Sequence, residues 1–130
     1  LITSSAASDV YKRQFQEIQD MRVSSHLYIK RTGETIQFVP LNMRAWHAGE
    51  SSFKGIKDCN NYSIGIELEG TDCDVYSNEQ YESLIKISRL IIKNYPETNK
   101  DSIVGHSDIS PGRKTDPGNK FEWRRYLDAL

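Results

Sequence analysis

The densest group of chemically capable side chains lies between His106 and Asp116, in the segment HSDISPGRKTD. Lys114 and Asp116 stand between two turn-forming pairs, Pro111-Gly112 and Pro117-Gly118. Such turns can fold the loop back, so that Asp116 returns to His106 and Lys114 faces the same point. Imidazole nitrogen and carboxylate oxygen are both good zinc ligands. The spacing indicates either a metal site or a capped surface loop with a solvated lysine and aspartate.

A second candidate is the pair of carboxylates in IELEG. Glu67 and Glu69 alternate with Ile66 and Leu68, so the acidic residues share one face of a predicted strand and the apolar residues share the other. A carboxylate on a buried or cleft-facing surface is costly unless it is paired or used in chemistry. The alternative is a sheet face that is open to solvent.

A third candidate is RAWHAG, residues 44–49. Trp46 and His47 beside a glycine in a loop could form an apolar wall for a sugar or a peptide. The alternative is that Trp46 anchors the loop to the core.

The elements that must position these residues follow from the hydrophobic pattern and the turn residues. Alternation favours strands around residues 63–70 and 102–105, and a capping box at 77–80 predicts a helix that runs to about Tyr95. The other expected elements are a hairpin over 22–39, a long irregular loop over 41–61 and a last helix from about Phe121. Loosely alternating strands and helices predict one α/β domain, a mixed β-sheet flanked by helices.

Composition excludes several classes of protein. The 130 residues suit one domain, and 37% hydrophobic with 27% charged residues is ordinary for a globular protein. A net charge of -1 gives no basic field for nucleic acid, and no apolar run of about 18 residues predicts a membrane span. Cys59 and Cys73 are expected to be reduced thiols, which favours a reducing compartment, although a disulfide is an alternative.

The first fourteen residues differ from the rest in showing neither periodicity nor cap chemistry. SSAASDVYKRQ, residues 4–14, is the in-frame translation of a sequence that resembles a transposase adapter used in sequencing libraries. We therefore expect residues 1–14 to be an adapter artefact outside the fold, and the native first strand to be missing, so that its sheet neighbours are left unpaired. The alternative is a divergent native N-terminus.

Three long segments carry a resemblance to a known family: RVSSHLYIKRTGETIQFVPLNMRAWHAG, CNNYSIGIELEGTD and GHSDISPGRKTDPG. In this order they resemble the AmpD-type 1,6-anhydro-N-acetylmuramyl-L-alanine amidases of the zinc amidase superfamily, which includes the peptidoglycan recognition proteins. The resemblance covers residues 15–130 and implies an amidase domain, incomplete at its N-terminus. It also implies a Zn²⁺ cofactor.

The resemblance assigns roles to individual residues. It implies His106 and Asp116 as zinc ligands and Glu67 and Lys114 as catalytic residues, with Glu69 in a supporting or structural role. The family's first histidine ligand belongs to a strand upstream of the legible sequence.

Neither His26 nor His47 matches that first ligand position. Arg22 and Trp46 match the substrate side, where the arginine would bind the stem-peptide carboxylate. Asp58 departs from the family, which often has a basic residue there.

The implied function is hydrolysis of the bond between anhydro-N-acetylmuramic acid and L-alanine during cytoplasmic cell-wall recycling. Small anhydromuropeptides would be the substrates of a monomer. The alternatives are a periplasmic amidase with broader substrates and a non-catalytic peptidoglycan-binding module of the same fold. The chain retains the implied ligand and catalytic residues His106, Asp116, Glu67 and Lys114, which argues against the binding module.

Overall fold

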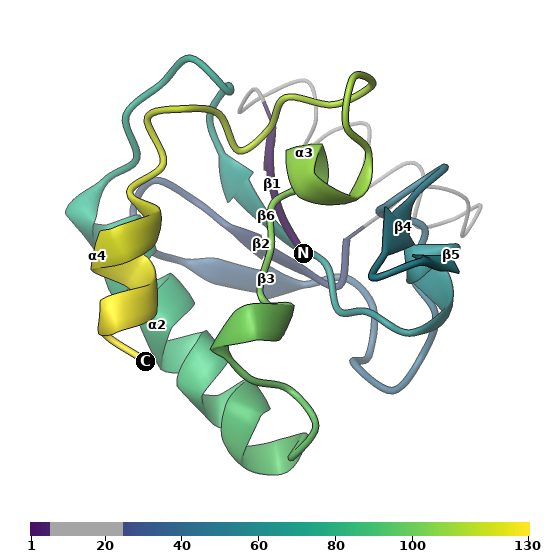
Figure 1. Ribbon diagram of the computed structural model, residues 1–130. Helices are drawn as coiled ribbons and strands as arrows, with labels where there is room; N and C mark the ends of the chain where they lie inside the picture. The colour runs from purple at the N-terminus through teal and green to yellow at the C-terminus, as the bar shows by residue number, and fades with distance from the viewer. Residues whose placement is uncertain (6–24) are drawn as a thin grey trace.

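The computed structural model describes residues 1–5 and 25–130, with only the backbone described for residues 3–5. Figure 1 shows how the elements are arranged. The strands are β1 (Ile2–Ser5), β2 (Leu27–Ile29), β3 (Thr35–Gln37), β4 (Ser52–Phe53), β5 (Ile56–Lys57) and β6 (Ile66–Glu69). The helices are α2 (Asn78–Asn94), α3 (His106–Ile109) and α4 (Trp123–Asp128), with 3₁₀ turns at Cys59–Asn61 and Lys100–Ser102.

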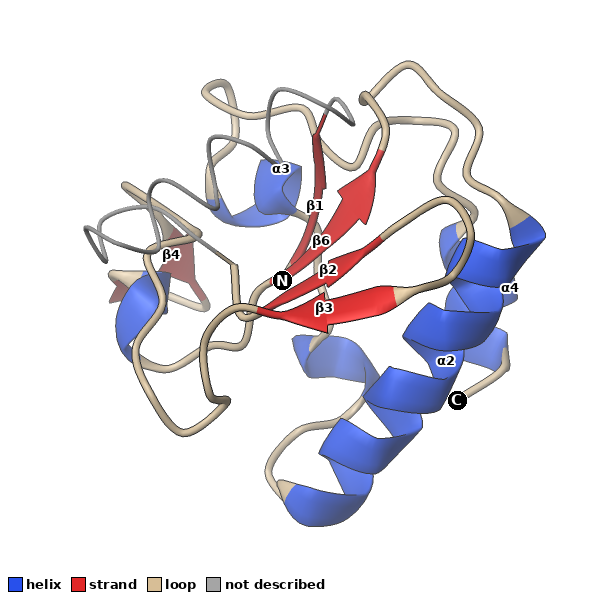
Figure 2. Ribbon diagram, turned by 180° about the vertical axis from the view of Figure 1, so that it is seen from behind, coloured by secondary structure: helices blue, strands red, loops and turns tan. Residues whose placement is uncertain are grey.

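Four strands form one mixed sheet in the order β1-β6-β2-β3, as Figure 2 shows. β6 is parallel to both β1 and β2, whereas β2 and β3 form an antiparallel hairpin. In both views α2 and α4 lie together towards one end of the sheet, and α3 lies towards the other, near β4. The expected α/β domain with a mixed sheet is confirmed.

The position of β1 corrects one expectation. We expected residues 1–14 to lie outside the fold and the first strand to be missing, but Ile2–Ser5 pairs with β6 along its whole length. The ladder needs only backbone donors and acceptors, and Ile2 adds an apolar side chain that is 1% exposed. The edge of β6 is therefore paired. Residues 6–14 lie outside the described part of the chain, and the adapter origin of residues 4–14 stays a prediction.

Local sequence signals explain the hairpin and the long helix. Gly33 has φ +86° in the turn between β2 and β3, where a side chain would be strained. Ser77 accepts from the Gln80 backbone while the Gln80 side chain accepts from the Ser77 backbone, so the expected capping box is formed. The helix ends at Asn94, before Pro96, as predicted.

Two smaller expectations need correction. The segment at 102–105 is not a strand, because it makes only a single bridge, Gly105 with Ile2, before α3 begins. The loop over 41–61 is not wholly irregular, because it contains the short β4–β5 hairpin and a 3₁₀ turn.

The core fills the space between the sheet and helices α2 and α4. Its buried members are Ile2, Leu27, Ile29, Ile66, Leu68, Tyr76, Tyr81, Leu84, Ile91, Phe121 and Tyr126. Cys59 and Cys73 are both free thiols, as expected. None of the helices in residues 1–5 and 25–130 is long and apolar enough to cross a membrane.

Candidate functional site

Glu67 lies in the middle of the sheet, on β6. Its register neighbours are position 3 of β1 on one side and Tyr28 of β2 on the other. The side chain is only 8% exposed, so of the two alternatives the buried one is confirmed. Glu69 has a structural role, because its Oε2 accepts from the Arg31 backbone N–H at 2.8 Å.

His106 begins α3 immediately after Gly105 and is 5% exposed. Its Nε2 lies 2.9 Å from the Ala48 carbonyl oxygen, which can only accept, so Nε2 carries the proton. Its Nδ1 lies 3.2 Å from Asp116 Oδ2, and this pair needs either a shared cation or a proton on Nδ1. Histidines that bind metals commonly donate their other ring N–H to a backbone carbonyl, as Nε2 does here.

Backbone bonds return Asp116 to His106, as the two turns predict. The Asp116 carbonyl accepts from Ser107 N at 3.0 Å, and Ser110 O accepts from both Arg113 N and Lys114 N. Tyr76 Oη donates to the next carbonyl, that of Pro117. Lys114 lies exposed on this loop.

Sheet pairing also relates His106 to Glu67. Ile2 of β1 pairs with Ile66 on one side and bridges Gly105 on the other. Glu67 and His106 each come one residue after a partner of Ile2, so they start from opposite sides of β1. Asp116 joins His106 through the contact between Oδ2 and Nδ1.

The other two histidines have structural partners. His26 is fully buried, its Nε2 lies 2.7 Å from Met43 O, and its Nδ1 accepts from Gly65 N at 3.1 Å. Burial lowers the pKa of His26, so the ring is neutral and joins β2 to two loops. Both ring nitrogens of His26 therefore bond backbone groups. The resemblance likewise does not assign His26 as a zinc ligand.

His47 packs against the backbone of Gly65, where an added Cβ would lie 2.4 Å from the ring. Its Nε2 lies 3.3 Å from Ser63 Oγ, and its ring centroid lies 5.5 Å from that of His26. Burial, followed by the positive amino terminus and His26, lowers the pKa of His47 to about 3. The ring is therefore neutral.

The donor set provides part of a metal site. Over residues 1–5 and 25–130, no three His, Cys, Asp or Glu side chains converge in a way that could hold a metal ion. His106 and Asp116 supply two donors, whereas a catalytic zinc site uses three protein ligands. Position 3 of β1, which lies between Glu67 and His106 in the sheet, is threonine.

Comparison with known sequences decides the family. The family model for N-acetylmuramoyl-L-alanine amidases matches residues 2–119. This chain belongs to that family.

Two curated amidases show the closeness of the relationship. The chain is 52% identical over 116 residues to the 1,6-anhydro-N-acetylmuramyl-L-alanine amidase AmpD of Haemophilus influenzae, and 51% identical over 112 residues to that of Escherichia coli. These alignments cover 89% and 86% of this chain but only 63% and 61% of the relatives. The chain thus spans about three fifths of the length of these amidases.

Solved amidase structures share the fold. A selenomethionine derivative of AmpD superposes with a TM-score of 0.86 at 36% identity, covering 100% of this chain and 82% of that one. The E. coli amidase AmiD, solved with the substrate anhydro-N-acetylmuramic acid-L-Ala-D-gamma-Glu-L-Lys, gives 0.87 at 30% identity, with coverages of 98% and 55%.

Of the two residues expected to bind the substrate, only Trp46 lies among the described residues. Arg22 lies outside the described residues. Trp46 is 47% exposed, so it does not anchor the loop in the core. The Arg44 guanidinium lies 4.2 Å from the centre of the indole ring and 3.4 Å from Asp58, the residue that departs from the family pattern.

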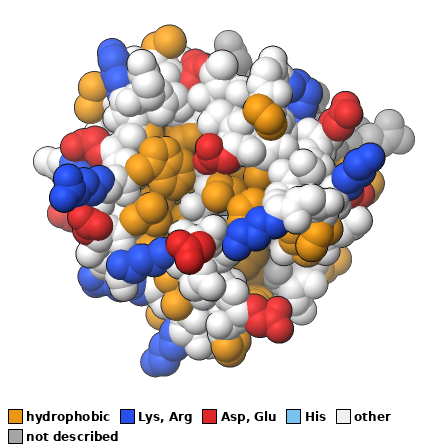
Figure 3. Space-filling view, in the orientation of Figure 1, with side chains coloured by type: hydrophobic (Ala, Val, Ile, Leu, Met, Phe, Trp, Pro, Cys, Tyr) orange, Lys and Arg blue, Asp and Glu red, His pale blue; other side chains and the backbone are white. Residues whose placement is uncertain are grey.

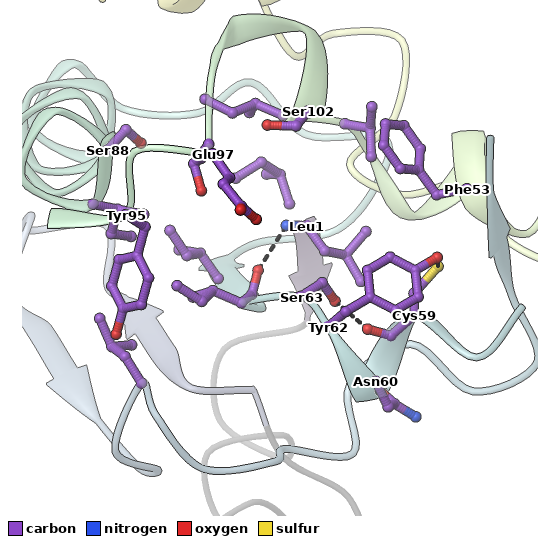
Figure 4. Close-up of a pocket in the computed structure, with 18 of the residues that line it drawn as sticks. Leu1, Phe53, Cys59, Asn60, Tyr62, Ser63, Ser88, Tyr95, Glu97 and Ser102 are labelled. Carbon is purple, nitrogen blue, oxygen red and sulfur yellow. Dashed lines mark hydrogen bonds between the residues drawn. The ribbon is translucent and has the colours of Figure 1, made fainter. Parts of the chain in front are cut away.

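A large hollow among the described residues lies elsewhere. It measures about 770 Å³ and lies beside Leu1, Tyr62, Tyr95 and Ile103. Figure 4 shows the Leu1 amino group in it, bonded to Ile64 O at 2.7 Å, and Figure 3 shows apolar side chains gathered on the same face. It contains none of the expected site residues. We place the site by its side-chain chemistry, because a hollow without convergent polar groups is a weak indication.

Sequence reasoning missed the groups that hold the site together. The Ala48 carbonyl bonds both His106 and Arg113, and the Tyr76 hydroxyl bonds the Pro117 carbonyl, next to Asp116. Arg113 adjoins Lys114 in GRKTDPG, but backbone acceptors leave no signal in side-chain spacing.

Proposed function

We propose that this chain is the catalytic part of a zinc-dependent amidase that hydrolyses the bond between 1,6-anhydro-N-acetylmuramic acid and L-alanine. The observation that carries this proposal is the approach of His106 Nδ1 to Asp116 Oδ2 at 3.2 Å, on the other side of β1 from the buried Glu67. The names of the AmpD relatives and the muropeptide in the AmiD structure support this substrate. The proposal includes a cytoplasmic monomer acting on free muropeptides.

His106 through Nδ1 and Asp116 through Oδ2 would hold the zinc. When bound, zinc lowers the pKa of a coordinated water to about 7 and polarises a carbonyl group. The hydrogen bond from His106 Nε2 to Ala48 orients the ring for this role.

Glu67 would accept the proton of the attacking water and return it to the departing L-alanine amine. Such general acid–base help contributes roughly 10²–10⁴-fold to the rate. Lys114 would stabilise the negative charge that develops on the lactyl carbonyl oxygen, a contribution of about 3 kcal/mol for a well-placed donor.

Two residues would bind the substrate. Arg22 would form a charge-assisted bond with the stem-peptide carboxylate. Trp46 would pack against the muramyl ring. Its indole is exposed, and the Arg44 guanidinium is stacked on one of its faces.

A binding module is the second candidate, because the described residues bring together only two metal donors, His106 and Asp116. Purified chain is mixed with anhydromuramyl-L-Ala-D-γ-Glu-L-Lys, with zinc or with a chelator. Release of the tripeptide is followed by mass spectrometry and binding by calorimetry, and His106→Ala is the matched control.

Zinc-dependent release that His106→Ala abolishes supports the amidase. Binding that ignores the chelator, without release, supports the binding module. Neither binding nor release contradicts both candidates.

A further inference from the structure

The exposed Arg113 side chain lies against the turn at the end of RAWHAG. Its Nη2 lies 2.7 Å from Ala48 O, 2.8 Å from Glu50 O and 2.9 Å from Ser110 Oγ. Ser110 Oγ also donates to Glu50 O at 2.7 Å. The Arg113 guanidinium thus joins the carbonyls of Ala48 and Glu50 to Ser110, the residue that follows α3.

Gly49 makes this close approach possible. It has φ +63°, and a Cβ added there would lie 3.1 Å from Arg113 Nη2. A side chain would face both backbone strain and contact with the guanidinium. The turn is therefore shaped around Arg113.

The Ala48 carbonyl accepts from two donors, Arg113 Nη2 and His106 Nε2. A carbonyl oxygen has two lone pairs, so both bonds can form together, and together they fix its direction. A carbonyl fixed in this direction keeps a proton of the His106 ring on Nε2. Nδ1 then stays directed towards Asp116 Oδ2.

We propose that Arg113 is a positioning residue: by clamping the Ala48 carbonyl, it sets the tautomer and orientation of His106. The inference rests on the proposed function in one respect: the use of this arrangement would be to hold Nδ1 beside Asp116, where a metal would bind. The hydrogen-bond geometry itself holds with or without amidase activity.

The test measures the ring nitrogens of His106 directly. Long-range ¹H–¹⁵N spectra of the whole, metal-free chain at neutral pH are assigned with His106→Gln. The unsubstituted chain should show a proton on Nε2. Arg113→Met should raise the ratio of Nδ1–H to Nε2–H at least about tenfold, because a charge-assisted bond that fixes the acceptor is lost.

Two further variants sharpen the comparison. Arg113→Lys keeps the charge but not the planar fork, so it should give an intermediate ratio, and it serves in place of the Met variant if that variant does not fold. Arg124→Met is the matched control, since the Arg124 side chain is 96% exposed and pairs with Asp128. It should leave the ratio unchanged.

A zinc titration separates this inference from the proposed function. Arg113→Met should weaken zinc binding about tenfold, in the range for supporting partners of metal ligands. If the unsubstituted chain binds no zinc, the proposed function fails while the tautomer ratio still decides the role of Arg113. An unchanged ratio in a folded Arg113→Met or Arg113→Lys variant overturns the inference.

Discussion

The Tyr76 hydroxyl donates to the Pro117 carbonyl at 2.7 Å, which ties the loop after β6 to the residue that follows Asp116. The Tyr76 ring is 3% exposed and meets Phe121 edge-on, with centroids 5.7 Å apart. Thr115 Oγ1 donates to Asp72 Oδ2 as a second tie between the same two loops. The position of Asp116 therefore depends on a segment far from it in sequence.

Tyr76→Phe removes the hydroxyl and keeps the ring. We expect a loss of about 1–3 kcal/mol in the free energy of unfolding, because a buried carbonyl loses its donor. We also expect about tenfold weaker zinc binding, because the loop holding Asp116 loosens. Urea unfolding and a zinc titration measure the two effects. Tyr126→Phe is the control, since its hydroxyl bonds Ser88 in the core, away from Asp116. Equal zinc affinities in the two variants would contradict this role.

Thr3→His tests the register of β1. Pairing places position 3 on the same sheet face as Glu67, and position 4 on the other face with Leu68. The unsubstituted chain, with two donors together among the described residues, should bind zinc weakly and show little amidase activity. A third imidazole at position 3 should strengthen zinc binding at least about tenfold and raise turnover, since loss of even a supporting partner costs 10–100-fold. Ser4→His is the matched control and should do neither. Equal gains in both variants would show that the histidine acts without regard to register.

Glu67→Ala should lower kcat at least about 100-fold in whichever form of the chain turns over, with zinc still bound. The expected cause is loss of the group that accepts and returns the proton. Glu69→Ala on the same strand is the comparison, because Glu69 serves the Arg31 backbone. Near-normal kcat in Glu67→Ala, measured beside zinc content, would remove Glu67 from the chemistry.

Acid should destabilise the chain through His47. Burial, reinforced by neighbouring charges, lowers its pKa to about 3 in the folded state, against 6.5 for the unperturbed ring. The unfolded chain therefore binds the extra proton first. The stabilisation from a neutral His47 is complete above about pH 6.5 and is lost as pH falls towards 3.

The loss is up to about 1.4 kcal/mol per pH unit for one such group, or about 2 kcal/mol between pH 7 and 5. His47→Gln should unfold in urea with a smaller difference between these two pH values. Identical pH dependence in the two proteins would mean that His47 titrates normally when folded. Burial also lowers the pKa of the Leu1 amino group to about 5, so that group is mostly neutral at pH 7. Desolvation of the ring by burial is the main cause of the His47 shift.

Short-range chemistry accounts for what the sequence could predict. The capping box at Ser77, the glycine turn at Gly33 and the two proline turns around Lys114 each depend on residues within a few positions, and all are formed. Period-two alternation in β6 likewise predicts Glu67 on the face opposite Leu68, and Glu67 is buried.

Backbone partners account for what the sequence could not predict. A strand over Ile2–Ser5 has one apolar side chain and depends on the ladder offered by β6. The short stretch before His106 makes a single bridge to Ile2, so its apolar residues did not produce a strand. The Ala48 carbonyl has no side-chain identity at all, yet it orients His106.

The turn around Arg113 limits how sequences of this family can be recombined. Gly49 and Arg113 belong to segments 64 positions apart, yet each is shaped to the other. A chimaera that takes RAWHAG from one amidase and GRKTDPG from another keeps the clamp only if both parents carry the glycine and the arginine. A chimaera with the glycine alone would lack the guanidinium that bonds the turn. A chimaera with the arginine alone would have a side chain at position 49 that displaces the guanidinium. These two motifs should therefore be exchanged together, as one heritable unit.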